Sequence, residues 1–173
     1  MEHRAVLELR TEGRKLLGYA AKFGTEARIG DFVETIRPGA FTNTLKTSGD
    51  ILALVDHDRT KVLARTRSGN LRLAEDAHGL QFELSIPDTQ AGRDVLALAE
   101  RGDLGGMSFG FVVPKDGERW QGKKRELLAV DLREISVVSA WPAYPETSVQ
   151  ARARTTPELN RAKRYLETCR WVC

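Results

Sequence analysis

Cysteine is almost absent from this chain: among 173 residues only Cys169 and Cys173 occur, both at the extreme end. A disulfide framework is therefore excluded for the body of the chain, and a reducing cytosolic setting is expected. Two thiols without a neighbouring histidine are too few for a metal site. Long apolar runs are also missing, so neither a membrane span nor a signal peptide is expected.

Charge of one sign is not concentrated over most of the chain. Lys and Arg number 27 and Asp and Glu 24, which leaves a formal net charge of +3. A surface that binds nucleic acid needs a concentrated basic face, so no nucleic-acid partner is expected. Phosphate-binding loops and paired metal-ligand motifs are absent from the sequence, and we therefore expect no cofactor and no metal.

Apolar runs of strand length, separated by turn residues, dominate the chain and predict a series of strands. The candidates are Leu16–Phe23, Phe32–Ile36, Ile51–Asp56, Val62–Thr66, Leu71–Glu75, Leu80–Ile86, Met107–Val113, Leu127–Val130 and Ile135–Ala140. Residues 117–124 are polar and predict a loop or the tip of a hairpin.

One well-formed helix stands among these strands. Asp88 or Thr89 is a suitable N-cap, apolar residues follow as far as Arg101, and Gly102 provides the stop. A short helix is predicted over Ala40–Lys46. Many strands with one central helix indicate an α+β, β-rich fold, built as a closed or half-open barrel.

The end of the chain has a different character. Residues 1–150 are expected to form one domain, and residues 151–173 a basic C-terminal tail. Within this tail, Pro157–Trp171 predicts an amphipathic helix. That helix either docks on the domain or serves as a tether for a partner.

Only three histidines are available as a general base. His3 lies in a terminus that we expect to be flexible, and His78 lies in a predicted hairpin turn. His57 differs, because it follows the buried-looking run Ile51–Val55 and is flanked by two aspartates. Strand ends that lead into loops are where a rigid scaffold commonly presents catalytic residues.

Ser108 lies in the glycine-rich segment Gly105-Gly106-Met107-Ser108-Phe109-Gly110-Phe111. The glycines leave room at the hydroxyl for a substrate backbone, although a buried serine in a glycine-rich strand fits the pattern as well. The segment formally matches the nucleophile elbow of α/β-hydrolases. We reject that fold because the elbow needs a helix after the serine, whereas here a strand is predicted.

Glu134 is the third candidate. It stands before the strongly strand-forming run Ile135-Ser136-Val137-Val138. Taken alone, it is equally consistent with a surface carboxylate paired with Arg133.

Taken in order along the chain, six segments resemble the tailed-phage prohead (capsid maturation) serine proteases. They are Gly18-Tyr19-Ala20, the stretch Glu34–Phe41, Leu54-Val55-Asp56-His57-Asp58, Gly105-Gly106-Met107-Ser108-Phe109-Gly110-Phe111, Leu132-Arg133-Glu134-Ile135-Ser136-Val137-Val138 and Pro142-Ala143-Tyr144-Pro145. The resemblance covers the region from Gly18 to Val149 and rests on the whole ordered set.

This family is similar in fold to herpesvirus assemblin, so the resemblance implies an assemblin-like β-barrel surrounded by a few helices. Carried over by position, Ser108 is the expected nucleophile and His57 the general base. Glu134 matches the acid of the family's Leu-x-Glu-Ile/Val-Ser pattern and is expected to orient the base. Asp56 and Asp58 remain alternatives for this role because they flank His57.

The activity implied is that of a serine endopeptidase which cleaves capsid scaffold or capsid-precursor segments, and itself, during prohead maturation. Residues 1–150 would form the catalytic domain, with Gly105 and Gly106 close enough to contribute to an oxyanion hole. The implied partners are the major capsid protein precursor or a scaffold protein, and a second copy of the chain. The expected location is the assembling procapsid in the host bacterial cytoplasm.

Two other readings stay open. The chain could be an inactive capsid assembly or scaffold protein that retains the protease fold. An esterase of unrelated fold is the other, and it requires a strand followed by a helix at Ser108.

Overall fold

A five-stranded sheet contains Ser108 and Glu134, and the turn between two of its strands contains His57. Its strands, in spatial order, are β1 (Glu2–Val6), β10 (Gly106–Val112), β13 (Asp131–Val138), β6 (Leu52–Val55) and β7 (Asp58–Arg65). Strand β13 runs parallel to β6, and the other neighbours are antiparallel. The structure, a computed structural model, describes residues 1–6, 9–47 and 49–139.

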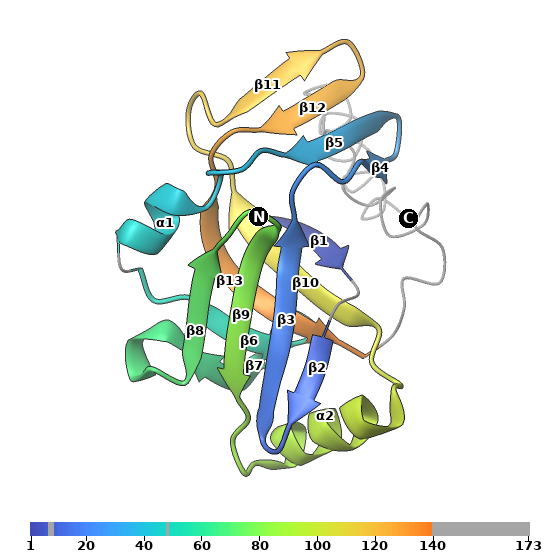
Figure 1. Cartoon of the computed structure of the whole chain (residues 1–173), viewed down its shortest axis with the longest axis vertical. Helices are drawn as coiled ribbons and strands as arrows, with labels where there is room; N and C mark the ends of the chain where they lie inside the picture. Colours follow the sequence, from blue (N-terminus) through green and yellow to red (C-terminus); the bar gives the residue numbers. More distant parts are fainter. Residues whose placement is uncertain (7–8, 48, 140–173) are drawn as a thin grey trace, which may run out of the picture.

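Two four-stranded sheets complete the strand framework (Figure 1). The first consists of β2 (Leu9–Glu12), β3 (Lys15–Lys22), β9 (Gly79–Ser85) and β8 (Leu71–Glu75). The second consists of β11 (Glu118–Gln121), β12 (Lys124–Leu127), β5 (Phe32–Ile36) and β4 (Ala27–Ile29).

The predicted α+β, strand-rich class is confirmed, but no closed barrel is found among the described strands, and the assemblin-like barrel is not confirmed. Within the described ranges the strands form three separate open sheets, each with two edge strands. A closed barrel requires an unbroken ladder of staggered neighbours. Here the ladders stop at β1, β7 and the edges of the smaller sheets, and β3 lies close to β1 and β10 without ladder pairing to them in the described ranges.

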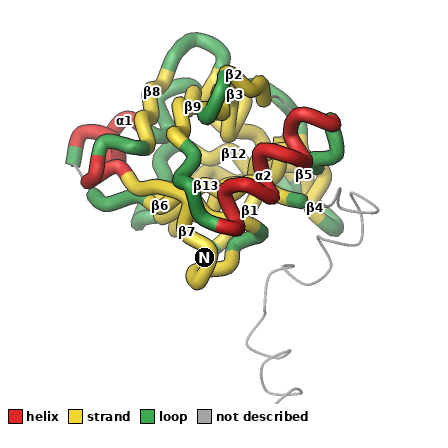
Figure 2. The backbone as a smooth tube through the Cα atoms, turned by 90° about the horizontal axis from the view of Figure 1, so that it is seen from below, coloured by secondary structure: helices red, strands yellow, loops and turns green. Residues whose placement is uncertain are grey.

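In the described part of the chain, two α-helices flank the sheets. Helix α1 (Thr42–Lys46) contacts β8 and β13, and α2 (Gln90–Arg101) contacts β2 and β7. Figure 2 shows α2 crossing one end of the molecule, beneath the strands. A short 3-10 turn, η1 (Thr66–Ser68), links β7 to β8. No helix in the described part of the chain is long and apolar enough to cross a membrane.

The ends of α2 are formed as the sequence predicts. Thr89, rather than Asp88, is the N-cap, because its side-chain oxygen accepts a hydrogen bond from the N–H of Gly92 at 3.2 Å. Gly102 ends the helix in the left-handed conformation with φ +74°.

The hydrophobic core is built around stacked and edge-on aromatic rings. Strand β10 places Met107, Phe109 and Phe111 on one face, and all three are fully buried. The ring of Phe109 stacks on that of Phe111 with centroids 5.3 Å apart and meets the edge of Phe41 at 5.8 Å. This face of β10 therefore belongs to the core, and the opposite face is available for other groups.

The N-terminus departs from the expectation. The segment that contains His3 is strand β1, paired with β10, and not a flexible end. Its sequence places three polar residues before two apolar ones, without the alternation that gives a strong strand signal. Residues 117–124 include β11, the turn and the first residue of β12, so they form most of the hairpin β11–β12. The turn is polar, and the two strands pair on either side of it.

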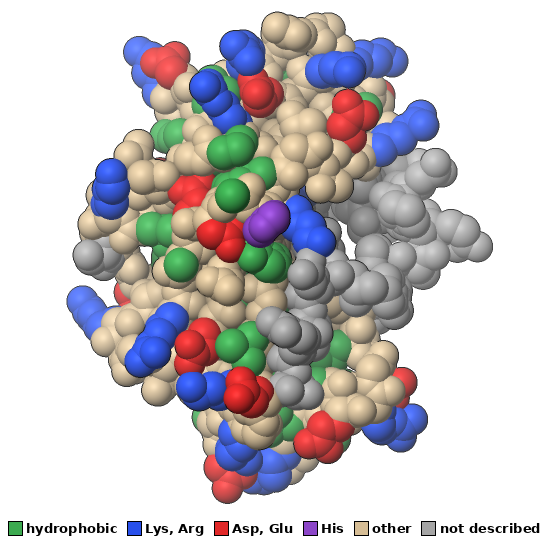
Figure 3. All heavy atoms as spheres, viewed as in Figure 1, with side chains coloured by type: hydrophobic (Ala, Val, Ile, Leu, Met, Phe, Trp, Pro, Cys, Tyr) green, Lys and Arg blue, Asp and Glu red, His purple; other side chains and the backbone are tan. Residues whose placement is uncertain are grey.

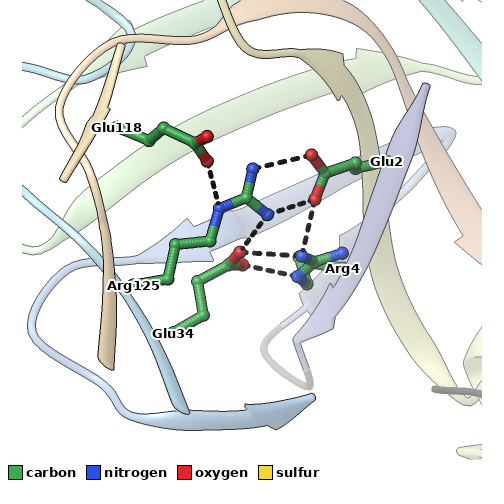
Figure 4. Close-up of polar contacts among 5 residues, drawn as sticks. All are labelled: Glu2, Arg4, Glu34, Glu118 and Arg125. Carbon is green, nitrogen blue, oxygen red and sulfur yellow. Dashed lines mark hydrogen bonds and ion pairs between the residues drawn. The ribbon is translucent and has the colours of Figure 1, made fainter. Parts of the chain in front are cut away.

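A cluster of two arginines and three glutamates fixes β1 in place (Figure 4). We call it the Arg125 cluster; its members are Glu2, Arg4, Glu34, Glu118 and Arg125. Arg125 is 7% and Glu34 2% exposed. Buried charges need paired partners, and this pairing ties β1 to β5, β11 and β12.

The expected C-terminal tail 151–173, its helix Pro157–Trp171, both cysteines and the segment Pro142–Pro145 lie outside the described residues.

Candidate active site

Ser108 and Glu134 lie on adjacent strands of the five-stranded sheet. Ser108 in β10 stands directly opposite Ser136 in β13, and Gly110 stands opposite Glu134. Directly opposed residues share a face of the sheet, as do residues two apart in one strand. Ser108, Glu134 and Ser136 therefore lie on one face, opposite the face that carries Phe109. All three are buried, with exposed fractions of 3%, 3% and 0%.

His57 is presented by a tight hairpin. Val55 at the end of β6 pairs with Asp58 at the start of β7, so that Asp56 and His57 alone form the connection. Both have positive φ, at +49° and +62°, as the favoured two-residue hairpin turns with two left-handed positions require. Asp and His tolerate this region better than most residues, yet the conformation is strained. Such strain persists only where surrounding contacts hold it.

Strand β13 supplies those contacts. The N–H of Asp56 donates to the carbonyl of Val137 at 2.9 Å. The two Asp56 carboxylate oxygens accept from the N–H of Ser139 at 2.8 Å and from its hydroxyl at 2.6 Å. The N–H of His57 donates to the hydroxyl oxygen of Ser136 at 3.3 Å. The hairpin is thus fastened to the strand that also carries Glu134.

The ring of His57 meets Glu134. The distance from His57 Nδ1 to Glu134 Oε1 is 2.7 Å, and the His57 side chain is 23% exposed. With an ionised carboxylate as acceptor, Nδ1 carries the hydrogen and Nε2 is left as a proton acceptor. The second oxygen, Glu134 Oε2, accepts a hydrogen bond from the Ser136 hydroxyl at 2.6 Å. A buried carboxylate is thereby satisfied on both oxygens.

The alternatives for the acid have other partners. Asp56 uses both carboxylate oxygens on Ser139. Asp58 accepts from the N–H and the hydroxyl of Thr60, and these bonds lower the pKa of its carboxyl. Of the three candidates, Glu134 is therefore the one in hydrogen-bond contact with the His57 ring.

His78 stays in the turn where the sequence places it. It follows β8 in a different sheet, is exposed, and its N–H donates to Asp76 at 2.7 Å. His3 belongs to β1, with Gly110 as its ladder partner.

The surroundings of Ser108 also exclude the α/β-hydrolase elbow. The strand continues past Ser108 to Val112 and is not followed by a helix. The N–H of Gly105 donates to the carbonyl of Val138 at 2.8 Å. This amide takes part in strand pairing, so Gly105 is a poorer candidate for the oxyanion hole than the sequence indicated.

Ser136 was not predicted from the sequence as a site residue. The pattern that could have identified it is an acid followed two residues later by a serine on a predicted strand, because this spacing places both side chains on one face. A buried carboxylate, a histidine that it holds and a serine on the neighbouring strand are the groups that acyl transfer requires.

The face of the molecule seen in Figure 3 carries acidic and basic side chains interspersed, without a broad area of one sign. This agrees with the mixed charge pattern of the sequence.

Comparisons with known proteins identify relatives whose sequences match most of this chain. The profile of a family described as caudovirus prohead serine protease matches residues 2–162. The prohead protease of Enterobacteria phage HK97 is 32% identical over 136 residues, which cover 78% of this chain and 58% of that protein. The chain thus spans little more than half the length of this curated relative. No solved structure matches. The chain belongs to the family of caudovirus prohead serine proteases.

Proposed function

We propose that this chain is a serine endopeptidase in which Ser108 is the nucleophile, His57 the general base and Glu134 the acid that orients His57. The observation that carries the proposal is the 2.7 Å contact between His57 Nδ1 and the buried Glu134 carboxylate. It is supported by the position of Ser108 on the same sheet face and by the membership of the family.

The chemistry follows from these roles. Ser108 Oγ attacks the scissile carbonyl carbon and passes its proton to His57 Nε2. The buried Glu134 carboxylate stabilises the imidazolium that forms. His57 then returns the proton to the leaving amine, and the C–N bond breaks. Water, activated by the same base, hydrolyses the acyl-enzyme.

The proposed substrates are scaffold or capsid-precursor segments and the chain's own ends. The family description and the name of the HK97 relative, a prohead protease, support this choice. Confinement inside a procapsid in the bacterial host raises the effective concentration of protease and substrate. That confinement would compensate for weak intrinsic activity. A dimer and the major capsid precursor as partner belong to the same proposal.

The division of the chain is proposed as well. Residues 1–150 form the catalytic domain, and the basic segment 151–173 is a tail that holds the protease to its precursor. Removal of the tail should then lower co-packaging with the precursor while leaving cleavage of a free peptide unchanged.

Co-expression with the capsid precursor tests the activity. Wild type should cut the precursor, whereas Ser108→Ala and His57→Ala should leave it intact. His78→Ala is the matched histidine control and should cut normally, because His78 lies in an exposed turn of another sheet. Mass spectrometry of the chain ends in wild type and Ser108→Ala reports self-cleavage.

An inactive assembly protein is the second candidate function. It predicts that wild type and Ser108→Ala both leave the precursor uncut while both associate with it. Cleavage that persists in Ser108→Ala would instead remove Ser108 from the mechanism.

A further inference from the structure

We propose that Ser136 is a positioning residue of this site, which holds Glu134 and the His57 hairpin in register with Ser108. The proposal rests on the proposed function, because it needs Glu134 and His57 in the roles given above. It extends that function to a side chain that none of the three roles includes.

The Ser136 hydroxyl makes two contacts that converge on the base. It donates to Glu134 Oε2 at 2.6 Å and accepts from the backbone N–H of His57 at 3.3 Å. The first contact is short, and a hydrogen bond to a charged acceptor is about twice as strong as a neutral one. Ser136 thereby joins the acid and the backbone of the base through one oxygen atom.

Burial makes this link consequential. Ser136 is 0% and Glu134 3% exposed, so water is a poor substitute for the lost donor. Without the hydroxyl, Oε2 of a buried carboxylate loses this donor, and the loss of a hydrogen bond to a buried charge is costly. The carboxylate would be free to rotate, and the contact of Oε1 with His57 Nδ1 would loosen.

Ser136 is also positioned against the nucleophile, through the register of the β10–β13 ladder. Ser136 is the direct cross-strand partner of Ser108. Since it stands between nucleophile and acid on one sheet face, it sets how far the His57 hairpin reaches over β13 toward Ser108. A shift of about 1 Å in such a group is enough to cost a large factor in rate.

The test compares Ser136→Ala and Ser136→Cys with wild type, using a peptide that spans the junction cut in the co-expressed precursor. We expect kcat to fall about 10-fold in Ser136→Ala, equivalent to about 1.4 kcal/mol, with KM unchanged. Ser136→Cys keeps similar volume with a weak donor, so it should fold and retain an intermediate kcat. The downfield proton resonance of His57 Nδ1–H should broaden or move in Ser136→Ala.

Thr44→Val is the matched control. Thr44, in helix α1, is also a buried hydroxyl in contact with β13; its oxygen accepts from the N–H of Leu132 at 3.1 Å, and it is not bonded to a carboxylate. It should lower the thermal midpoint without changing kcat or the His57 resonance. A merely structural role for Ser136 predicts that both variants behave alike.

A double-mutant cycle separates this proposal from the assignment of the site. In a Glu134→Gln background, Ser136→Ala should cause a smaller loss than in wild type, because the effect that passes through Glu134 is already removed and only the contact with the His57 N–H remains. An unchanged kcat in folded Ser136→Ala or Ser136→Cys, alongside a slow Glu134→Gln, overturns the role of Ser136 alone. An unchanged kcat in Glu134→Gln overturns the proposed acid, and the role of Ser136 with it.

Discussion

Both carboxylate oxygens of Asp56 are bound by Ser139, one by its N–H at 2.8 Å and the other by its hydroxyl at 2.6 Å. This pair closes the end of β13 onto the hairpin that carries His57. It explains how two consecutive residues keep positive φ without glycine. Asp56 is therefore a support for the hairpin and not a competitor of Glu134.

Replacing Asp56 by alanine should slow the reaction by loosening this hairpin. The change removes two hydrogen bonds and places alanine at φ +49°, so we expect a loss of about 1–3 kcal/mol in the free energy of unfolding. We also expect a fall in kcat, since His57 follows directly. Chemical denaturation and cleavage kinetics measure the two effects.

Asp58→Ala is the control for that variant, because the partners of Asp58 are its near neighbours Thr60 and Lys61 and not β13. Its kcat should stay near that of wild type. Equal kcat for Asp56→Ala and wild type would show that the hairpin holds His57 without Asp56.

Glu134→Gln should lower kcat about 10²–10⁴-fold, because an amide stabilises the imidazolium poorly and can fix the wrong tautomer. The fold should be kept, as glutamine has the same shape. Kinetics on the precursor peptide measure the effect. Glu83→Gln, which removes a carboxylate paired with Lys15 on another sheet, should leave kcat unchanged; a comparable loss there would point to a general effect of charge.

Arg125→Met should destabilise the protein by about 3–5 kcal/mol, because it removes the buried cation shared by Glu2, Glu34 and Glu118 and leaves Glu34 with Arg4 alone. Thermal or chemical unfolding measures the loss. Arg119→Met, which removes an exposed arginine paired with Glu126, should cost less than about 1 kcal/mol. If the two variants have equal stability, the Arg125 cluster does not hold the fold together.

Acidification should release strand β1. Burial alone would raise the pKa of Glu2, but hydrogen bonds and charge from Arg125 and Arg4 outweigh it and lower the pKa below its ordinary 4.5. The ionised Glu2 therefore contributes stability above pH about 4.5, which is lost as the pH falls through the folded-state pKa. The protection factors of the β1 amides, which correct for the slower intrinsic exchange in acid, should fall over that window in wild type.

In Glu2→Gln the same amides should exchange faster at neutral pH and change less on acidification. A wild-type β1 that stays protected equally well throughout that acid window would contradict the role given to Glu2.

Gly79→Ala should destabilise the β3–β9 pair. An added Cβ would come within 2.0 Å of the carbonyl oxygen of Ala21, which forces the backbones apart at a cost of about 1–3 kcal/mol. Gly49→Ala is the control, since nothing lies within 4 Å of its added Cβ. Comparison of the two thermal midpoints tests the prediction.

Features that depend on residues close together in the chain could be predicted from the sequence. The pattern of apolar runs predicts β5 and β8 over the same residues as observed, and the caps of α2 at Thr89 and Gly102 follow from local hydrogen bonding and backbone preference. Strands β1 and β2 could not be predicted, since their stability comes from pairing with β10 and β3. The predicted barrel is not confirmed for a related reason, because closure depends on how ladders from distant parts of the chain meet.

By itself the sequence determined the strand-rich class, the ends of α2 and the residue types available for acyl transfer, through periodicity and capping that act within a few positions. Only the tertiary structure decided which acid meets His57. Glu134 lies 77 residues from His57 in the chain, whereas Asp56 and Asp58 adjoin it. The parallel register of β6 and β13 brings the distant carboxylate to the ring, and the strained hairpin turns the adjacent ones toward Ser139 and Thr60.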